Sequence, residues 1–584
     1  MAAPTLRAAL LFEVKARVLR CRRAVRDARG GPRRFTQIPP RPDDVVLAES
    51  ISRLWTSRED AAVAERALNA GKVQNLRLAA RRIDGALVPA GATFSFWKHV
   101  GRATRRRGYV SGRELREGCL VPSVGGGLCQ LSNALYDAAL RAGFEIVERH
   151  AHTAVVPGSL AEAGRDATVF WNYVDLRFRP ACEARIEVTL TADSLIVRLW
   201  GAWSRTSAVV EHSTSAVPRA VPSGDCASCA VEQCFRHVGI RRHAVAERTA
   251  FLLDAHWPEY DAYVGSIARR DDVVFVPLDG RRRGTRNYRW QTAGVDDVRE
   301  SPLLVMLRSY QSRRLAQHGA ARQRMLLAWA RRMAENVAAR LPPEATHLVV
   351  MQHLLPALWE GRHLGGRTYD VLMTGFPMRA LHAALDRAYG LHPQSPTLAD
   401  FRAAPELVEA EESALAGART IVTPHARIAA MFGSRGLRLP WSAPERDAGA
   451  NTTDPQRDTV LFPASTLGRS GAYELRDAAR SRGLRVLLTG PDLEGAGFWD
   501  GISVERMPFD EALASGPAAV VLPAHVEHQP RRLLAAAARG IPVIATDACG
   551  IVAAAGVHLV PSGDAEALAD AIERVSNGVS ALRA

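Results

Sequence analysis

The sequence predicts a multidomain protein in which an α+β domain precedes two α/β lobes with parallel sheets. Three observations lead to this prediction. A chain of 584 residues is too long for one hydrophobic core. Residues 61–203 combine helical patterns with glycine-rich, strand-like stretches. From about residue 246 onward, short apolar runs alternate with helical patterns, which is typical of parallel sheets covered by helices.

The composition is that of an ordinary globular protein, with 47% hydrophobic, 6% aromatic and 23% charged residues. The formal net charge is +15, and nearly all of the positive charge is arginine, because lysine occurs only at Lys15, Lys72 and Lys98. Nothing in the sequence resembles a nucleic-acid-binding fold, which argues against DNA or RNA as a partner. A basic surface suits nucleoside diphosphates or anionic lipid headgroups equally well, so the charge alone does not identify the partner.

Residues 1–60 form a basic N-terminal segment and a proline-containing lead-in. Within this segment, residues 6–29 mix apolar residues with many arginines. The pattern indicates either an amphipathic helix lying on the inner face of a membrane or a terminal helix packed on the protein. The apolar run is too short for a signal peptide or a membrane span, and no later stretch reaches the length that a span needs. We therefore expect a cytoplasmic protein, peripheral at the inner membrane face if this helix binds lipid.

Residues 61–203 form the predicted α+β domain. Periodic alanine, leucine and arginine residues predict a helix over residues 61–83. A second helix is expected from Cys129 to Ala142, where apolar residues form one stripe and Gly143 is placed to end it. Strands are expected near residues 144–154, 168–178 and 184–200, the last of them broken by a turn at 192–194.

The densest local signal is Gly125-Gly126-Gly127-Leu128-Cys129-Gln130, immediately before the second helix. Glycine permits positive φ and a close backbone approach, so Cys129 is expected at an exposed helix start. There the helix dipole and the unpaired amides favour a thiolate. Gln130 could donate a hydrogen bond to an oxyanion. The motif therefore predicts a cysteine-centred site.

A histidine partner for Cys129 is expected from the strand that follows the second helix. His150 and His152 share one face of that strand, because side chains alternate with a period of two. We predict His152 as the general base and His150 as its alternative, with Asp175 or Asp166 as the orienting carboxylate. The other interpretation is that Cys129 is a small buried helix residue and the histidines are ordinary polar groups of the sheet.

Several blocks in this domain resemble the VanW family. They are Asn75-Leu76, Gly91 to Trp97, Gly101-Arg102, Arg107-Gly108-Tyr109, Gly125 to Asn133, Glu148-Arg149-His150 and Asp166 through Phe178. The resemblance covers about residues 65–200, and the number of ordered blocks makes it specific. The family takes its name from vancomycin-resistance gene clusters, so the resemblance implies a role related to antibiotic resistance and the cell envelope without naming a reaction.

Residues 204–245 form a cysteine-bearing connector. Cys226, Cys229, Cys234 and His237 lie close together in this segment. A C-x2-C pair closes readily around one metal ion, so these four residues are the predicted ligands of zinc or of an iron–sulfur cluster. The alternative is a helical linker with reduced cysteines.

Residues 246–584 contain two series of short apolar runs. They predict two Rossmann-like lobes, over residues 246–442 and 443–584. The runs of the first lobe are 251–253, 273–277, 347–351, 371–374 and 420–423. Those of the second lobe are 459–463, 485–489, 518–522, 543–546 and 558–560.

The same half of the chain resembles a GT-B glycosyltransferase, most closely the retaining group. The clearest match runs from Ala519 through Glu527 and Gly540-Ile541-Pro542 to Asp564, with further similarity from Glu409 to Phe432. In such enzymes the second lobe holds a nucleotide-sugar donor and the first lobe binds the acceptor. The resemblance implies transfer of a sugar from a nucleotide donor to an envelope glycan or a lipid-linked acceptor.

The donor-site residues depart from the pattern of that group. Glu527 lacks the second acidic residue that usually follows, and the usual Gly-Arg and Lys that hold the diphosphate are replaced from Ser465 onward. Arg469 or Arg531 could supply the missing charge, since a guanidinium binds phosphate through two hydrogen bonds. Glu527, Ser465, Arg469 and Arg531 are therefore the predicted donor-binding residues. A non-catalytic glycan- or nucleotide-binding protein is the alternative, and a cysteine-dependent VanW-like enzyme is the second alternative.

Overall fold

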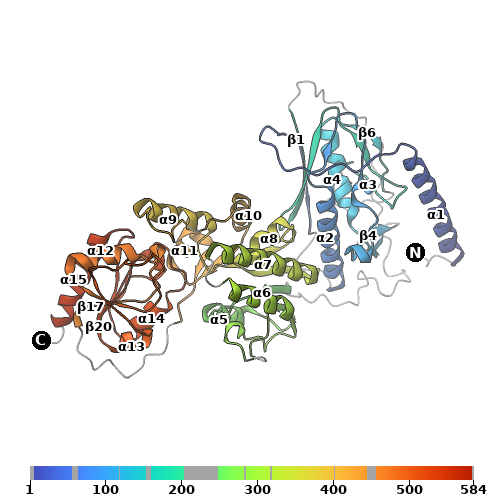
Figure 1. Cartoon of the computed structure of the whole chain (residues 1–584). Coiled ribbons are helices and arrows are strands. Elements are labelled where there is room, and N and C mark those ends of the chain that lie inside the picture. Colours follow the sequence, from blue (N-terminus) through green and yellow to red (C-terminus); the bar gives the residue numbers. More distant parts are fainter. Residues whose placement is uncertain are drawn as a thin grey trace. The chain divides into compact units, whose positions relative to one another are not determined.

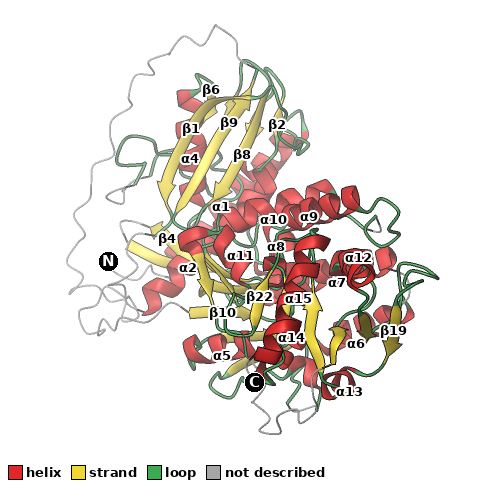
Figure 2. Cartoon of the chain, turned by 90° about the vertical axis from the view of Figure 1, so that its left-hand side faces the viewer, coloured by secondary structure: helices red, strands yellow, loops and turns green. Residues whose placement is uncertain are grey.

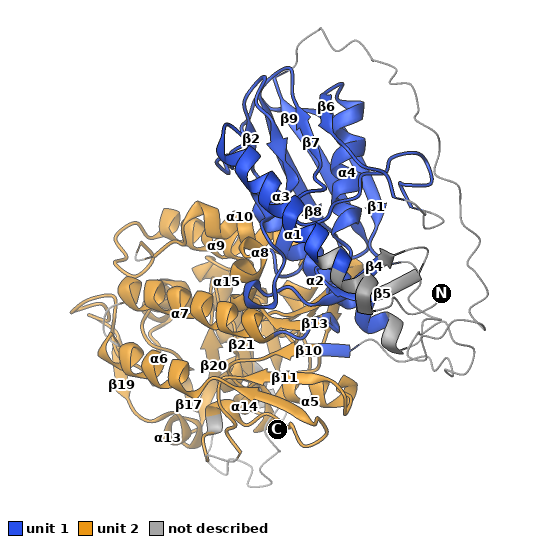
Figure 3. Ribbon diagram, turned by 90° about the vertical axis from the view of Figure 1, so that its right-hand side faces the viewer, with its two compact units in different colours: residues 1–249, 341–347, 362–368 blue, residues 250–340, 348–361, 369–584 orange. Residues whose placement is uncertain are grey.

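The computed structural model describes residues 6–55, 63–116, 119–152, 159–202, 248–281, 284–315, 319–399, 401–442 and 456–581. Figure 1 follows the chain from its blue N-terminus to its red C-terminus. The chain divides into two compact units (Figure 3): residues 1–249 with 341–347 and 362–368 form unit 1, and the remaining residues form unit 2. None of the helices in the described ranges is long and apolar enough to cross a membrane. The predicted metal ligands Cys226, Cys229, Cys234 and His237 lie outside the described residues.

Unit 1 contains both helices and antiparallel sheets, which confirms the predicted α+β class. Its helices are α1 (Leu6–Ala28), α2 (Val63–Ile83), α3 (Phe96–Val100) and α4 (Leu128–Arg141). Its strands are β1 (Val45–Arg53), β2 (Leu87–Val88), β3 (Phe94–Ser95), β4 (Ser111–Arg116), β5 (Cys119–Val124), β6 (Glu145–Glu148), β7 (Arg177–Arg179), β8 (Ala184–Leu190) and β9 (Ser194–Gly201). The main sheet has the antiparallel order β1-β9-β8-β2, seen side by side in Figure 2. A three-stranded sheet β3-β7-β6 and the hairpin β4-β5 accompany it.

The core of unit 1 forms where the two long helices pack on the main sheet. Helix α4 contacts β1 and β9, and α2 contacts β8 and α4. Leu76, Leu131 and Leu135 are fully buried at these contacts, and each such side chain contributes about 1.5–3 kcal/mol by leaving water. Two predicted strands are shorter than expected, because β6 ends at Glu148 and the segment from 168 to 176 is a loop.

Helix α1 packs on unit 1 through its polar side. Arg23 pairs with Glu148, and Asp27 pairs with Arg177. Its apolar side chains are exposed instead, at Leu11, Val14, Val18 and Val25. An apolar stripe beside arginines suits a lipid surface. The membrane contact stays a prediction, which co-sedimentation with anionic vesicles would test.

Unit 2 contains two lobes, each built on its own sheet, although the first residues of three strands of the first lobe (248–249, 345–347 and 368) are grouped with unit 1. The strands of the first lobe are β10 (Arg248–Leu252), β11 (Val273–Val276), β12 (Asp297–Glu300), β13 (Ala345–Met351), β14 (Thr368–Leu372), β15 (Thr420–Thr423) and β16 (Gly436–Arg438). Its helices are α5 (Pro258–Ile267), α6 (Pro302–Arg314), α7 (Gly319–Arg340), α8 (Leu355–Glu360), α9 (Met378–Leu391), α10 (Pro405–Ala416) and α11 (Ala426–Met431). Helices α5, α6 and α10 begin with proline, where its missing N–H costs nothing and its fixed φ favours the first turn.

The second lobe repeats this construction. Its strands are β17 (Gln456–Phe462), β18 (Arg485–Leu488), β19 (Ser503–Arg506), β20 (Pro517–Leu522), β21 (Val543–Ala545) and β22 (Val557–Leu559). Its helices are α12 (Ala472–Arg482), α13 (Phe509–Ala514), α14 (Arg531–Ala538) and α15 (Ala565–Ala581). The central strand β20 is buried along its whole length, as the continuous apolar run Ala518–Leu522 requires of a strand covered on both faces.

Both sheets have the strand order of a Rossmann fold. The first is β12-β11-β10-β13-β14-β15-β16 and the second is β19-β18-β17-β20-β21-β22. The pairings β11 with β12, β14 with β15 and β17 with β20 are parallel. In each sheet the order reverses beside the first strand, between β10 and β13 and between β17 and β20. This switch point is where α/β proteins bind ligands, at the carboxyl ends of the strands.

Candidate active sites

The first candidate site begins at the glycine-rich turn before α4. Gly127 is the residue before the helix, with φ +97°, a left-handed conformation that favours glycine. A Cβ at Gly126 would lie 2.4 Å from the carbonyl oxygen of Gly112, so only glycine allows this backbone contact. The turn therefore places Cys129 in the first turn of α4, where backbone N–H groups have no partner within the helix. The helix start is where the sequence predicts it, but Cys129 is half-buried there and not exposed.

The Cys129 thiol lies beside the loop that precedes β7. Its Sγ is 3.7 Å from the Thr168 hydroxyl and 4.0 Å from the carbonyl oxygen of Val169. Burial alone would raise the pKa of Cys129, but the hydrogen bond and the charge of His152, with weaker contributions from Val169 and Thr168, lower it below its ordinary value. The site therefore favours a thiolate, the nucleophilic form of cysteine.

His152 is held by a carboxylate on its other side. Its Nδ1 lies 2.5 Å from Asp166 Oδ1, and its backbone N–H donates to Asp166 Oδ2. Burial alone would lower the pKa of His152, but the hydrogen bond to Asp166, together with the hydrogen bond and charge of Cys129, raises it to about 10. The thiol of Cys129, the imidazole of His152 and the carboxylate of Asp166 are thus linked in a row, an arrangement that covalent catalysis can use.

A cavity of about 820 Å³ opens over Cys129 and His152. Its walls include the indole rings of Trp55, Trp97 and Trp171. Among the described residues that line it, the basic side chains are those of Arg20, Arg53, Lys72, Arg102 and Arg113, and the acidic one is that of Glu114. Burial, reinforced by the charge of Arg113, lowers the pKa of Lys72 to about 7. The cavity suits an anionic ligand with an apolar part.

Three predicted partners of Cys129 have other roles in the structure. Asp175 binds the hydroxyl of Ser95 and the guanidinium of Arg177, so it holds β3 and β7 together and does not orient His152. The side-chain amide of Gln130 donates to the Ser52 hydroxyl and the Arg53 carbonyl, at 3.0 and 2.7 Å, and is therefore committed to the end of β1. His150 is exposed and contacts Glu148, because β6 ends before it.

The second candidate site is a cleft of about 440 Å³ between the two lobes of unit 2. Its lining residues follow the carboxyl ends of the central strands of both sheets: Ala255, Trp257, Met351, His353, Thr374, Arg469, Val526, Glu527, His528 and Gln529. The switch points of both sheets therefore contribute to one cleft. Two of the predicted donor-binding residues, Arg469 and Glu527, lie in it.

Backbone contacts hold Arg469 against the loop that carries Glu527. The carbonyl oxygen of Arg469 accepts hydrogen bonds from the backbone N–H groups of His525 and Val526, at 2.9 and 3.2 Å. A carboxylate oxygen of Glu527 accepts from the backbone N–H of Gln529 at 2.7 Å. The Arg469 side chain is exposed, so a guanidinium and a carboxylate lie at the switch point of the second lobe.

The first lobe contributes a histidine backed by an aspartate, which the sequence analysis missed. His353 Nε2 lies 2.7 Å from Asp254 Oδ2, and Arg308 binds both oxygens of Asp254 at 2.6 Å. Burial alone would raise the pKa of Asp254, but Arg308 and His353 hold it well below its ordinary value. Asp254 follows β10 and His353 follows β13, so the signal was a polar, titratable residue within two positions of the end of each of two predicted strands.

Two other predicted donor residues lie outside this cleft. Arg531 binds both carboxylate oxygens of Glu259 in the first lobe, at 2.5 and 2.6 Å, and its guanidinium lies over the rings of Trp257 and Trp441. Its charge therefore neutralises a buried carboxylate and not a diphosphate. Ser465 is half-buried. It packs closely against Gly490, because a Cβ added at Gly490 would lie within 3 Å of atoms of Ser465.

Arg531→Ala is expected to destabilise unit 2 by on the order of 3 kcal/mol, because it leaves the fully buried Glu259 carboxylate without its charged partner. Chemical denaturation measures the effect. The control is Arg270→Ala, which removes an ion pair to Asp296 that is exposed on both sides and should cost less than about 1 kcal/mol. Equal stability of the two variants would show that the Glu259 pair does not hold the lobes.

Comparisons with known proteins match two parts of the chain. Residues 71–200 match the family model described as VanW like protein, and residues 506–577 match the one described as Glycosyl transferases group 1. The uncharacterised protein YoaR of Bacillus subtilis is 44% identical over 111 residues, which are 19% of this chain and 36% of that protein. The vancomycin B-type resistance protein VanW of Enterococcus faecalis is 37% identical over 130 residues, 21% of this chain and 47% of that protein. This chain thus spans less than half the length of either relative.

Among solved structures, this chain is similar to a sucrose-phosphate synthase from Thermosynechococcus elongatus. It has a TM-score of 0.35 and 14% sequence identity, and the match covers 57% of this chain and 91% of that one. The assignment of two Rossmann-like lobes rests on the strand orders and parallel registers themselves.

Proposed function

The chain carries a VanW-like domain at residues 71–200 and a group 1 glycosyltransferase domain near its C-terminus, and from this premise we propose that unit 2 transfers a sugar from a nucleotide donor to an acceptor related to the cell envelope. The observation that carries the proposal is the cleft in which the switch points of both Rossmann-like lobes meet. Arg469 binds the donor diphosphate, and Glu527 binds hydroxyl groups of the donor. An envelope-related acceptor is proposed because the same chain carries a VanW-like domain, whose resemblance implies a role at the cell envelope.

His353 is the base of this proposed reaction. It lines the same cleft as Arg469 and Glu527. The imidazole takes the proton of the acceptor hydroxyl while that oxygen attacks the sugar, and the nucleoside diphosphate leaves. The Asp254 carboxylate orients the ring and stabilises the imidazolium that forms, as a buried carboxylate does in other pairs of a histidine base and an aspartate.

Calorimetric titration with nucleoside diphosphates tests the donor site. The protein is expected to bind at least one of them, and Arg469→Ala is expected to weaken that binding about 10- to 100-fold, since a hydrogen bond to a charged group contributes about 1.5–3 kcal/mol. The control is Arg457→Ala, an exposed arginine at the start of β17, which should leave the affinity unchanged. Binding of none of these nucleotides would instead favour a lobe that recognises a glycan without turnover.

A second candidate function belongs to unit 1, and the contacts among Cys129, His152 and Asp166 favour it specifically. We propose that this site catalyses acyl transfer or hydrolysis on an anionic acyl or peptide substrate. The Cys129 thiolate attacks the carbonyl carbon, and a C–S bond forms. His152 gives its proton to the departing amine or alcohol, leaving an acyl-enzyme. Water or another nucleophile, deprotonated by His152, then releases the acyl group.

The surroundings of this site support the substrate class. In this proposal, unpaired N–H groups of the first turn of α4 donate to the oxyanion of the tetrahedral intermediate. The surplus of basic side chains around the cavity suits a carboxylate or phosphate on the substrate, and the three tryptophans suit an apolar segment.

A further inference from the structure

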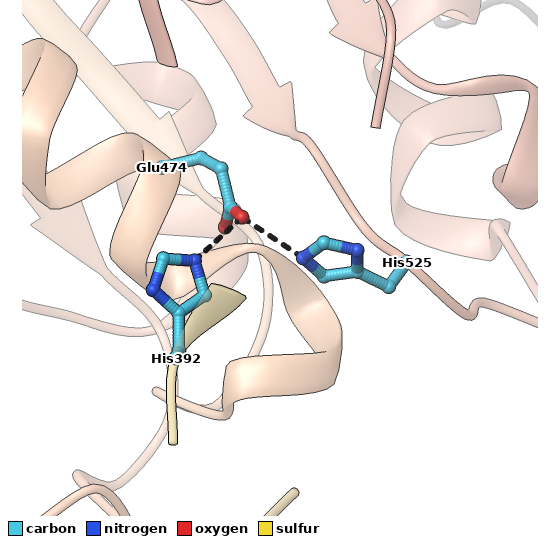
Figure 4. A group of neighbouring side chains, drawn as sticks. All are labelled: His392, Glu474 and His525. Atoms are coloured by element: carbon cyan, nitrogen blue, oxygen red, sulfur yellow. Dashed lines mark hydrogen bonds and ion pairs between the residues drawn. The ribbon is translucent and has the colours of Figure 1, made fainter. Parts of the chain in front are cut away.

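A cluster of two histidines and a glutamate lies at the start of α12, and none of its three residues is among those that line the interlobe cleft. Figure 4 shows His392 and His525 pointing toward the carboxylate of Glu474 from two sides. The Nε2 atoms of both rings lie 2.9 Å from the same oxygen, Oε1 of Glu474. The three ligand atoms lie within 4.8 Å of one another. This spacing brings three metal-ligating groups to one point.

The carboxylate is buried and only half satisfied. The side chain of Glu474 is 2% exposed, yet its second oxygen, Oε2, has no hydrogen-bond partner among the described residues. A buried polar atom without a partner costs about 1–3 kcal/mol, so an unfilled acceptor here points to a ligand.

The rings of both histidines are fixed by neighbours other than Glu474. His525 Nδ1 lies 3.0 Å from the hydroxyl of Ser562, which leaves Nε2 facing the carboxylate. His392 stacks on the ring of Tyr473, with centroids 4.4 Å apart and 11° between the planes. Metal-bound histidines usually form a hydrogen bond through their other ring nitrogen, as His525 does with Ser562, and this bond orients the ligand.

We propose that His392, Glu474 and His525 form a binding site for one divalent transition-metal ion of the zinc class. Two imidazole nitrogens and one carboxylate are a known three-residue set for zinc, which leaves a fourth position for water or a ligand. Metal binding at Nε2 requires that nitrogen to carry no proton, so a ring that donates from Nε2 to Glu474 passes to the tautomer protonated at Nδ1. The bound ion also places a positive charge near Oε2 of Glu474.

The site connects the two lobes of unit 2. His392 follows α9 of the first lobe, whereas Glu474 and His525 belong to α12 and to the loop after β20 of the second lobe. A bound ion would therefore fix the loop that carries Val526 and Glu527 against the first lobe. Its effect should appear as stability of unit 2, whatever reaction the protein catalyses.

Cobalt(II) is the probe for this site, because its visible spectrum reports the ligands. The full-length protein is used in a Cys226→Ser, Cys229→Ser, Cys234→Ser background, so that the connector cysteines cannot supply ligands. We expect one equivalent of cobalt to bind without a sulfur-to-cobalt charge-transfer band and to raise the thermal midpoint of unfolding.

Glu474→Gln and His392→Ala are expected to weaken cobalt binding at least 100-fold. Ser562→Ala should weaken it about 10- to 100-fold, as the loss of an outer hydrogen bond to a ligand does. His558→Ala, an exposed histidine on β22, is the control and should bind as the parent does. A folded parent that binds no cobalt, or a Glu474→Gln variant that binds it with parental affinity, overturns the proposal. These outcomes are independent of nucleotide binding, so they do not depend on the proposed transferase.

Discussion

Iodoacetamide is expected to label Cys129 about 10-fold faster at pH 7 than it labels Cys21, although Cys21 is exposed and Cys129 is not. An ordinary thiol is only a few per cent ionised at pH 7, whereas His152 lowers the pKa of Cys129. The gain is smaller than the change in thiolate fraction, because a thiolate of lower pKa is a weaker nucleophile. Peptide mapping after short exposure measures each cysteine separately.

The dependence on His152 separates this prediction from simple exposure. His152→Ala removes the group that lowers the thiol pKa, so the pH 7 rate should fall toward that of Cys21. In the parent protein, the labelling rate should decline on acidification only when the pH passes the lowered pKa of Cys129. Above that pKa the rate should stay level up to about pH 10, where His152 loses its proton. Equal rates in the parent and in His152→Ala would rule out the ion pair.

Covalent chemistry at Cys129 needs its own readout. An activated ester with a free carboxylate should leave an acyl group on the protein, detected by intact mass. Cys129→Ser should abolish this adduct, and Cys182→Ser should leave it unchanged, since Cys182 lies outside the lining of the cavity. Fast alkylation without any acyl adduct would leave a binding pocket as the better account of the site.

His353→Ala is expected to lower kcat for sugar transfer by about 10²- to 10⁴-fold, the range for losing a general base, with the nucleotide Kd unchanged. The nucleotide Kd should stay unchanged because His353 is on the acceptor lobe, whereas Arg469 and Glu527 are on the donor lobe. Release of free nucleoside diphosphate measures turnover, and calorimetry measures binding.

Two further variants make this experiment specific. Asp254→Asn should lower kcat in the same direction, because an amide stabilises the imidazolium less than a carboxylate does. The control His558→Ala should match the parent. A His353→Ala variant with parental kcat would remove His353 from the reaction, and one that also loses nucleotide binding would indicate a collapsed cleft.

The strands of unit 2 show how far a sequence pattern reaches. Every predicted apolar run of both lobes corresponds to a strand of the structure. The strands missed were β12, β16 and β19, which lie at the edges of the two sheets and are only partly buried. An edge strand has a neighbour on one side only, so segments such as Asp297–Glu300 lack the continuous apolar run that marks a buried strand.

The cysteine site was placed by a motif, and its partners were placed by the fold. The glycine turn predicted Cys129 at the start of a helix, and the structure has it there. His152 does approach Cys129, but not from a strand face, because β6 ends at Glu148. A loop carries it, and Asp166 holds both its ring and its backbone N–H. Strand periodicity could not distinguish Asp166 from Asp175, because that choice depends on how two loops pack.

The sequence by itself determined the α+β unit, the two parallel-sheet lobes and the helix start at Cys129, because these follow from apolar periodicity and from glycines that tolerate positive φ. Only the tertiary structure decided which charges meet. It paired Arg531 with Glu259, joined His353 to Asp254, and brought His392 to Glu474 and His525 across the two lobes. Each of these contacts joins residues far apart in the chain. A charged side chain at the surface can be solvated by water, so a particular partner becomes necessary only when the fold buries that charge.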